Sequence, residues 1–378
     1  WRSIAPSLLQ NTEKPSAVFP QITIAARGEP YPLVGAISPW NFPLLLAFID
    51  AIPALMAGSA VYVKPSDVTP RFVEPLNAAI AAVPELRSVL AVAAGDGAVG
   101  AALTPLVDVV AFTGSVATGR KVGEAAAMAF IPAFLELGGK DPAIVLHGAD
   151  LDRAATAILR ASVVATGQAC QSLERVYVDA RDFDAFVRLL TEKAQATPLA
   201  RNGGGIVGPL IFCRQAEIIA DHLRDAIEKG ARVECGGAVE NADGARWIAP
   251  TVLTGVTHAM KVMTEETFGP IIPVMPFRTI DEAVALANDT IYGLSAAVFG
   301  ATEQEAFAVA ERLDAGGVSI NDAGLTTMVF EAEKSGFKMS GLGPSRMGPT
   351  GLTRFLRRKA FYVNRGAVAP IEAFRETD

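Results

Sequence analysis

Short apolar runs alternate with helical segments along this sequence of 378 residues. In the first part of the chain, runs that read as strands lie at residues 34–38, 60–63, 88–94, 107–112 and 132–137, and helices are predicted at 44–56, 70–83 and 118–128. Short buried strands that alternate with helices of about 10 to 15 residues indicate βαβ units and a parallel sheet. The alternation therefore predicts an α/β fold.

A second series of the same kind begins after residue 141. Its predicted strands are 143–146, 175–178, 271–277, 295–299 and 317–320, and its predicted helices are 151–166 and 216–229. A chain of this length should divide into two or three domains. We place one boundary near residues 137–141 and interpret residues 359–368 as a terminal strand that could reach another subunit.

The composition excludes several classes of protein. With 51% hydrophobic residues, 19% charged residues and a net charge of -7, the chain can form a large core and carries no electrostatic signature of nucleic-acid binding. The longest apolar stretch, 33–56, is broken by prolines and a charge, so we predict no membrane span, and we recognise no signal peptide. Because the chain begins at Trp1, we expect that upstream residues are missing from it.

The cysteines and histidines number three each. An odd, sparse set of cysteines argues against a disulfide framework and for a reducing, cytoplasmic location. The spacing of these residues suggests no metal site.

Three patterns could bind a cofactor. Gly95, Gly97 and Gly100 fit G-x-G-x-x-G between a strand and a helix, which can hold a pyrophosphate, although a chance turn is about as frequent in a chain with 34 glycines. The segment 112–115, Phe-Thr-Gly-Ser, could approach a phosphate or simply cap a helix. Lys64 with Asp67 could grip ribose hydroxyls, or be a surface pair.

Two residues could carry the chemistry. Cys170 follows a predicted helix among small residues, where a substrate could reach it, yet an arbitrary cysteine is more often an inert core residue. Glu136 is the one acid of an apolar strand, so we expect it to be partly desolvated, as a general base often is. A buried acid with a structural partner is an equally good interpretation of Glu136 from its local context.

Six motifs, taken in order, distinguish these alternatives. They are Pro-Trp-Asn-Phe-Pro at 39–43, Val-Lys-Pro-Ser-Asp at 63–67, Phe-Thr-Gly-Ser at 112–115, Leu-Glu-Leu-Gly-Gly-Lys at 135–140, Gly-Gln-x-Cys at 167–170 and Glu-Glu-Thr-Phe-Gly-Pro at 265–270. Their order and spacing closely resemble the aldehyde dehydrogenase superfamily over essentially the whole chain. The resemblance favours the catalytic interpretation of Cys170 and Glu136.

The resemblance implies a reaction. Cys170 would attack an aldehyde carbonyl, and the side-chain amide of Asn41 with the backbone N–H of Cys170 would stabilise the oxyanion. Hydride would pass to NAD or NADP, and Glu136 would activate a water that hydrolyses the thioester. The products would be a carboxylic acid and the reduced cofactor.

The resemblance also implies binding residues. Lys64, Ser66 and Asp67 would hold the adenosine half of the cofactor, Gly114 and Ser115 the pyrophosphate, and Glu266 the nicotinamide ribose. The whole expected cofactor set is Ser38, Pro39, Trp40, Lys64, Ser66, Asp67, Gly97, Phe112, Gly114, Ser115, Thr118, Leu137, Gly138, Glu266 and Phe268. The substrate tunnel would include Phe42, Leu46 and Ile49, which favours aromatic or apolar aliphatic aldehydes, although Leu46 and Ile49 could equally be core residues.

The expected architecture is aldehyde dehydrogenase-like α/β. It combines a Rossmann-type cofactor domain (1–138), an α/β catalytic domain (139–345) and a C-terminal segment (346–378) with an oligomerisation strand. Residues 15–30 would form a β arm that pairs with the terminal strand of a partner, giving a homodimer or homotetramer.

The sequence departs from the family pattern in three places. Asp67 stands where a glutamate is frequent, which leaves the choice between NAD and NADP open, and Asp50 stands where many members have a lysine. Residues 333–336, Glu-Lys-Ser-Gly, replace the usual Pro-Phe-Gly-Gly. Two alternatives stay open: a member that transfers the acyl group to coenzyme A, which the presence of Glu136 disfavours, and a non-catalytic relative that keeps the fold.

Overall fold

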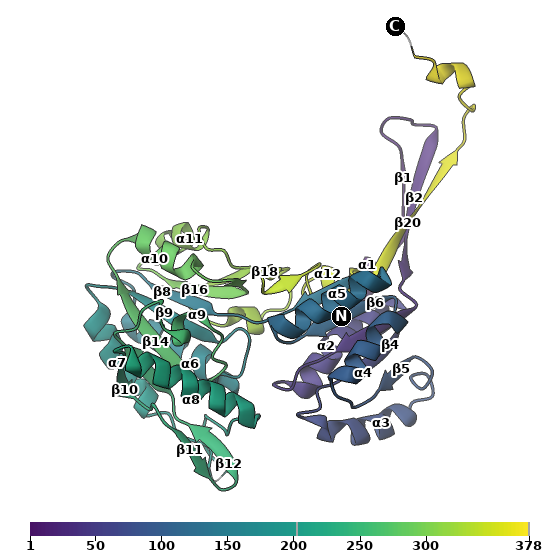
Figure 1. Cartoon of the computed structure of the whole chain (residues 1–378). Coiled ribbons are helices and arrows are strands. Elements are labelled where there is room, and N and C mark those ends of the chain that lie inside the picture. The colour runs from purple at the N-terminus through teal and green to yellow at the C-terminus, as the bar shows by residue number, and fades with distance from the viewer. Residues whose placement is uncertain (202, 377–378) are drawn as a thin grey trace.

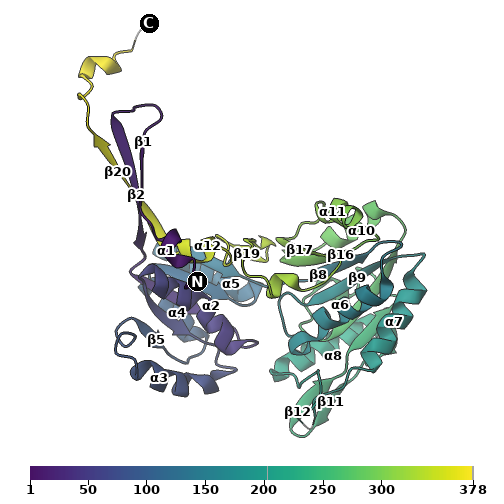
Figure 2. The ribbon, with the colours of Figure 1, turned by 180° about the vertical axis from the view of Figure 1, so that it is seen from behind.

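The computed structural model describes residues 1–201 and 203–376. Figure 1 shows two lobes, each built on its own sheet, and a ribbon of three strands that projects from the N-terminal lobe. Figure 2 shows the same arrangement from behind, with the C-terminal end beyond the tip of the ribbon. Within the described residues, no helix is long and apolar enough to span a membrane.

The sheet of the N-terminal lobe has six strands in the order β19-β7-β6-β3-β4-β5. The strands are β3 (Leu33–Ile37), β4 (Ala60–Lys64), β5 (Leu90–Val92), β6 (Val109–Thr113), β7 (Ala133–Glu136) and β19 (Gly341–Leu342). The connecting helices are α2 (Pro43–Ala57), α3 (Val73–Ala81), α4 (Gly97–Leu103) and α5 (Val116–Ala129). Neighbouring strands are parallel except for β19, which runs antiparallel to β7. The order reverses direction at β3, so the loops after β3 and β6 open on the same edge, where α/β sheets bind ligands.

The sheet of the other lobe has seven strands in the order β10-β13-β14-β9-β8-β16-β17. They are β8 (Asp141–Val145), β9 (Leu173–Asp179), β10 (Arg232–Cys235), β13 (Thr251–Thr254), β14 (Ile271–Phe277), β16 (Ser295–Phe299) and β17 (Gly317–Ile320). Its helices are α6 (Leu151–Val163), α7 (Phe183–Gln195), α8 (Cys213–Glu228), α9 (Lys261–Thr264), α10 (Ile280–Asn288) and α11 (Glu303–Ala310). Short additional elements are β11 (Val239–Ala242), β12 (Ala245–Ile248), β15 (Tyr292–Gly293) and β18 (Phe337–Lys338).

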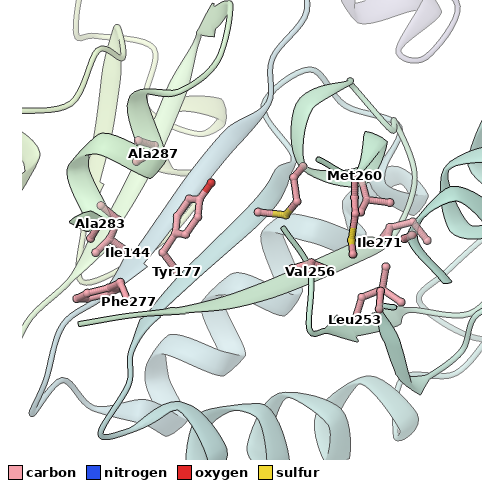
Figure 3. Close-up of a cluster of buried hydrophobic side chains, with 14 of the residues drawn as sticks. Ile144, Tyr177, Leu253, Val256, Met260, Ile271, Phe277, Ala283 and Ala287 are labelled. Atoms are coloured by element: carbon pink, nitrogen blue, oxygen red, sulfur yellow. The ribbon is translucent and has the colours of Figure 1, made fainter. Parts of the chain in front are cut away.

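Alternate residues of these strands supply two cores on opposite faces of the sheet, as the pleat of a strand requires. Ile144 of β8 belongs to one core, whereas Ala143 and Val145 belong to the other. Figure 3 shows part of the first core, where Ile144, Tyr177 and Phe277 from three neighbouring strands pack together. The continuous apolar runs in the sequence therefore reflect burial on both faces.

The projecting ribbon consists of β1 (Thr12–Pro15), β2 (Ile22–Pro30) and β20 (Leu356–Asn364), all antiparallel. The terminal strand thus begins and ends earlier than the predicted 359–368. It pairs with β2 of its own chain, whereas we expected pairing with a partner. The reason lies at the foot of the ribbon, where α12 (Thr350–Thr353) packs against α2 and buries Phe355 and Leu356 in the N-terminal core, beside α1 (Ala5–Leu8).

Most other elements also differ from their predicted bounds by a residue or more, three of them as follows. The helix predicted at 151–166 ends at Val163, because Ala165 and Thr166 adopt positive φ angles of 51° and 61° that an α-helix cannot contain. The predicted helix 70–83 divides into a 3-10 turn, Pro70–Phe72, and α3. The predicted strand 88–94 shortens to β5.

Candidate active site

Three of the glycine-containing motifs, 135–140, 167–170 and 265–270, contact one another where the two lobes meet. A Cβ on Gly139 would collide with the backbone carbonyl oxygen of Cys170. A Cβ on Gly167, whose φ is +69°, would collide with the backbone of Gly269. Only glycine permits such approaches. Segments that are far apart in the sequence are therefore held in backbone contact around Cys170.

Cys170 lies in the loop between the 3-10 turn Val164–Gly167 and β9, and it is half-buried. The side chain of Gln168 fixes this loop, because its Nε2 donates to the carbonyl of Ala165 at 3.0 Å and its Oε1 accepts the N–H of Ile211 at 2.9 Å. The loop is thus a rigid support for the sulfur.

Burial, and next the charges of Glu266 and Asp141, raise the pKa of the Cys170 thiol to about 12. The charge of Lys334 acts in the opposite direction, and Glu136 adds a smaller increase. The thiol is therefore protonated at neutral pH in the ligand-free protein. For the sulfur to act as a nucleophile, this proton would have to leave.

A cavity of about 230 Å³ opens in front of Cys170. It is lined by Pro39, Trp40, Asn41, Leu46, Thr113, Gly114, Ser115, Leu137, Gly138, Cys170, Gln215, Ile218, Glu266 and Phe268. Eleven of these fourteen residues were predicted from the sequence, and Thr113, Gln215 and Ile218 were not. Gln215 and Ile218 stand on α8, whose approach to the cavity no local motif indicates.

Asn41 is buried immediately before the start of α2, at Pro43. Its Nδ2 donates to the carbonyl oxygen of Gln168 at 2.9 Å. A side-chain amide has two N–H groups, so one remains for an oxygen atom in the cavity. The hydrogen bond orients the amide beside the loop that carries Cys170.

Aromatic rings form one wall of the cavity. The ring centroids of Trp40 and Phe268 lie 5.3 Å apart in an edge-to-face arrangement, and Trp40 lies 5.8 Å from Phe212. Phe268 has a positive φ of 54°, an uncommon conformation for a bulky residue. A flat, apolar ligand group would pack against this wall.

Two charged residues stabilise the conformation of Phe268. The carboxylate of Glu174 accepts the backbone N–H groups of Thr267 and Phe268, each at 2.7 Å. Lys140 donates to Glu174 at 2.6 Å and to the hydroxyl of Thr267 at 3.0 Å, with Lys140 and Glu174 both fully buried. We did not predict either residue as functional. The available signal was the pair of adjacent charged residues, Glu174 and Arg175, directly before the apolar run 176–178.

Glu266 lies beside the Gly138–Gly139 turn. Its Oε1 accepts the N–H of Gly139 at 3.0 Å. Burial, and next the charge of Glu174, raise the pKa of Glu266 to about 8. The carboxyl group is therefore largely protonated at neutral pH and can donate as well as accept.

Glu136 ends β7, and its register partners are Thr113 of β6 and Gly341 of β19. It is half-buried, as we expected from its place in an apolar strand. It does not line the cavity of Cys170. The two residues nevertheless interact electrostatically, since Glu136 contributes to the raised pKa of the thiol.

The other expected cofactor residues lie around the same edge of the sheet. Lys64, at the end of β4, is buried, and this burial lowers its pKa against the opposing charges of Asp67 and Asp96. Ser66 is buried with its Oγ accepting the N–H of Val68 at 3.2 Å, whereas Asp67 is exposed.

Four more of the expected residues lie at helix starts or strand ends. Gly97 opens α4 with free space where a Cβ would stand, and Phe112 is buried under Gly114. The Oγ of Ser115 accepts the N–H of Thr118 at 3.3 Å at the start of α5. Ser38 is buried, and among the described residues its hydroxyl has no hydrogen-bond partner.

The expected substrate residues do not all reach the cavity. Leu46 lines the cavity. Phe42 and Ile49 are half-buried and do not line it. The predicted tunnel from these three residues therefore stays a prediction.

Comparison with known proteins gives a consistent result. A protein of Mycolicibacterium smegmatis named putative succinate-semialdehyde dehydrogenase with NADP(+) is 40% identical over 343 residues, which are 89% of this chain and 66% of the relative. The chain thus spans just under two thirds of that relative. The structure of the putative aldehyde dehydrogenase PutA from Anabaena variabilis has a TM-score of 0.96 and 56% identity, covering 98% of this chain and 80% of that one.

A more distant structure gives the same fold. The aldehyde dehydrogenase of Mycobacterium tuberculosis complexed with NAD+ has a TM-score of 0.90 and 32% identity, covering 97% of this chain and 75% of that one. The sequence model of the aldehyde dehydrogenase family matches residues 3–361. The cavity in front of Cys170, the rigid loop behind it and these matches together lead to one conclusion: the chain belongs to the aldehyde dehydrogenase family.

Proposed function

We propose that this protein oxidises an aldehyde to the carboxylic acid with NAD or NADP, through a covalent intermediate on Cys170. The observation that carries the proposal is the cavity that brings Cys170, Asn41 and Glu266 together from three distant motifs. The relatives support it, because one is named with NADP(+) and another was solved with NAD+.

The residues present fit a nicotinamide dinucleotide. The aromatic wall of Trp40 and Phe268 suits a flat ring, and the N-terminus of α5 at Ser115 suits a phosphate. The unpartnered buried hydroxyl of Ser38 would gain a hydrogen bond from a polar ligand atom. When bound, the cofactor would accept the hydride that leaves the substrate carbon.

The chain's own residues would carry out the covalent steps. The thiol of Cys170 passes its proton to solvent water as its sulfur bonds to the aldehyde carbon, and the free N–H of Asn41 stabilises the negative oxygen that forms. Loss of the hydride with its electron pair oxidises this adduct to a thioester. Glu136 then takes a proton from water as the water oxygen bonds to the carbonyl carbon, the C–S bond breaks, and the acid leaves.

The substrate class is a separate proposal. Leu46 lines the cavity with aromatic neighbours, which supports aromatic or apolar aliphatic aldehydes. The relative whose name contains succinate semialdehyde supports a different substrate class, a charged aldehyde. Turnover of benzaldehyde well above that of succinic semialdehyde would support the apolar proposal, and comparable rates would remove its basis.

The enzymatic proposal is tested by the formation of reduced cofactor across an aldehyde panel, with NAD and NADP in parallel. We expect activity in the wild type and in Cys213→Ser, an exposed cysteine, and none in Cys170→Ser. No reduction of either cofactor by the wild type would favour a non-catalytic relative. A rate that requires coenzyme A would favour acyl transfer instead of hydrolysis.

We also infer a homodimer or homotetramer. The ribbon exposes large apolar side chains, with Tyr362 of β20 72% exposed and Phe19 of the β1–β2 turn 54% exposed. Such surfaces usually mark an interface. Light scattering after size exclusion should give a mass of two or four chains, and a monomer would contradict the inference.

A cytoplasmic location stays a prediction from the sparse cysteines.

A further inference from the structure

Thr267 lies between two residues of the candidate site, Glu266 and Phe268, and is 1% exposed. Each of its polar atoms has a partner. Its N–H donates to the carboxylate of Glu174 at 2.7 Å, and its carbonyl oxygen accepts from Nε2 of Gln215 at 2.7 Å. The segment 266–268, which carries two cavity-lining side chains, is therefore held at its middle residue.

The hydroxyl of Thr267 joins two further side chains. Lys140 donates to its Oγ1 at 3.0 Å, and Nδ1 of His222 lies 3.2 Å from the same atom. An ammonium group only donates, so the hydroxyl accepts from Lys140 and keeps its own hydrogen for a second partner. The Nδ1 of a neutral imidazole can accept this hydrogen, whereas that of an imidazolium cannot. The arrangement thus requires a neutral His222 whose hydrogen is on Nε2.

The surroundings of His222 favour this neutral form. Burial, and next the charge of Lys140, lower the pKa of His222 from its ordinary value of 6.5. Glu265 and Glu174 oppose this change and Lys261 of α9 adds to it, and the pKa is lowered on balance. On the other side of the ring, Nε2 lies 3.5 Å from the carboxylate of Glu265, so its hydrogen faces an acceptor.

Helix α8 brings His222 to this position. Gln215, Ile219 and His222 are spaced by four and three residues, so they lie on one face of the helix. This face packs directly against the end of the segment 266–268, because a Cβ on Gly269 would lie only 2.4 Å from the side chain of Ile219. One helix face therefore lines the cavity at Gln215 and supports the segment at His222.

We propose that His222 is a positioning residue: it accepts the hydrogen of the Thr267 hydroxyl and so fixes the segment that presents Glu266 and Phe268 to the cofactor. This inference rests on the proposed function, in which those two side chains hold the nicotinamide half. His222 does not line the cavity of Cys170, so it acts through Thr267. Without the acceptor, the hydroxyl hydrogen would be buried unpartnered, and the segment would lose a contact that holds Phe268 at its positive φ of 54°.

The test is the affinity for the reduced cofactor, measured by titration calorimetry without aldehyde, with NADH and NADPH in parallel. His222→Leu removes the acceptor and keeps an apolar side chain in the buried position, so we expect its dissociation constant to rise about tenfold. His222→Asn places an amide oxygen near the position of Nδ1 and should restore most of the affinity. In turnover, KM for the cofactor should rise in His222→Leu while KM for the aldehyde stays unchanged.

His258→Leu is the matched control. His258 lies in the same lobe and is hydrogen-bonded to Tyr177 at 2.9 Å and to Asp289 at 2.7 Å, and neither partner lines the cavity. Its loss should leave the cofactor affinity unchanged even where it lowers the stability. A merely structural His222 would likewise lower the stability or the binding stoichiometry without raising the dissociation constant.

A double-mutant cycle with Thr267→Val tests the hydrogen bond itself. Thr267→Val removes the hydroxyl from the other side and keeps the shape of the side chain. Because His222 acts through this hydroxyl, adding His222→Leu to Thr267→Val should raise the dissociation constant no further. An additive effect of the two changes would overturn the proposal.

The outcomes separate the two proposals. Wild-type turnover together with an unchanged dissociation constant in His222→Leu, or with no recovery in His222→Asn, would overturn the role of His222 alone. A wild-type protein that forms no reduced cofactor would instead refute the proposed function, and this inference with it.

Discussion

Gly139 and Cys170 are in backbone contact, so that a Cβ at position 139 would occupy the place of the Cys170 carbonyl oxygen. Asp141 Oδ1 would lie 2.9 Å from the same Cβ. The position of Cys170 is therefore set by a glycine from another motif. Neither neighbour is the flexible end of a long side chain, so the contact cannot be relieved cheaply.

Gly139→Ala should consequently displace the loop of Cys170. We expect a loss of about 1–3 kcal/mol in the free energy of unfolding and the loss of nearly all activity. Denaturant titration and turnover measure the two effects. Gly123→Ala is the matched control, because its Cβ would meet only Leu135 at 3.5 Å inside α5, where alanine is favoured by about 0.5–1 kcal/mol. An active Gly139→Ala protein would contradict the account of the contact.

The raised pKa of Cys170 predicts slow alkylation of the ligand-free protein. Because only the thiolate reacts and the pKa lies at about 12, the rate with iodoacetamide should still be rising at about pH 10, where a free thiol of pKa about 8.5 has reached its plateau. The measurement uses a protein with Cys213→Ser and Cys235→Ser, so that Cys170 is the one thiol left. A plateau near pH 9 would refute this prediction.

Glu136→Gln should separate the two halves of the reaction. The variant can still form the thioester but lacks the group that takes a proton from water. We expect a burst of about one equivalent of reduced cofactor followed by a steady-state rate at least about 100-fold lower than that of the wild type. Stopped-flow absorbance gives both quantities. Glu124→Gln, an exposed acid on α5, should behave as the wild type, and undiminished steady turnover in Glu136→Gln would exclude its role as base.

Glu266 should make the stability of the ligand-free protein fall as the pH rises. Its pKa is raised from 4.5 to about 8 by burial, so the folded state holds the proton more tightly than the unfolded state. The stabilisation from this proton is complete below pH 4.5 and is lost as the pH rises through about 8.

Glu266→Gln removes this titration. The variant should therefore gain stability relative to the wild type between about pH 5 and about pH 9, as measured by denaturant unfolding. Asp141, whose pKa is also raised by burial, to about 7, is present in both proteins and cancels in the difference. Glu217→Gln, an exposed acid on α8, should show no such trend. A constant difference between wild type and Glu266→Gln across this range would contradict the buried, protonated state.

Most strands of the two large sheets could be predicted from the sequence, because apolar runs buried on both faces of a sheet leave a strong pattern. Ser295–Phe299 and Gly317–Ile320 have the predicted bounds. The end of α6 could not be predicted, since Ala165 and Thr166 are ordinary helix residues by their local pattern. Their left-handed conformation depends on the packing of the loop that carries Cys170.

Some residues of the candidate site could likewise be predicted from the sequence, and others could not. The ordered motifs predicted that Cys170, Asn41 and Glu266 act together, and the three residues line one cavity. This could be predicted because each motif is a short local stretch of sequence. Lys140 and Glu174 were not predicted, because their buried ion pair joins the segment before β8 to β9, 34 residues later in the chain.

The sequence by itself determined the α/β class, the two series of strands and a candidate nucleophile, because these depend on local periodicity and on short motifs. Only the tertiary structure decided that the terminal strand pairs with β2 of its own chain and that Arg346 binds Asp50 of α2. Both depend on the path by which the last fifty residues return to the N-terminal lobe. That path is set by the packing of Leu352 and Phe355 into a distant core, and the local pattern of those residues does not reveal it.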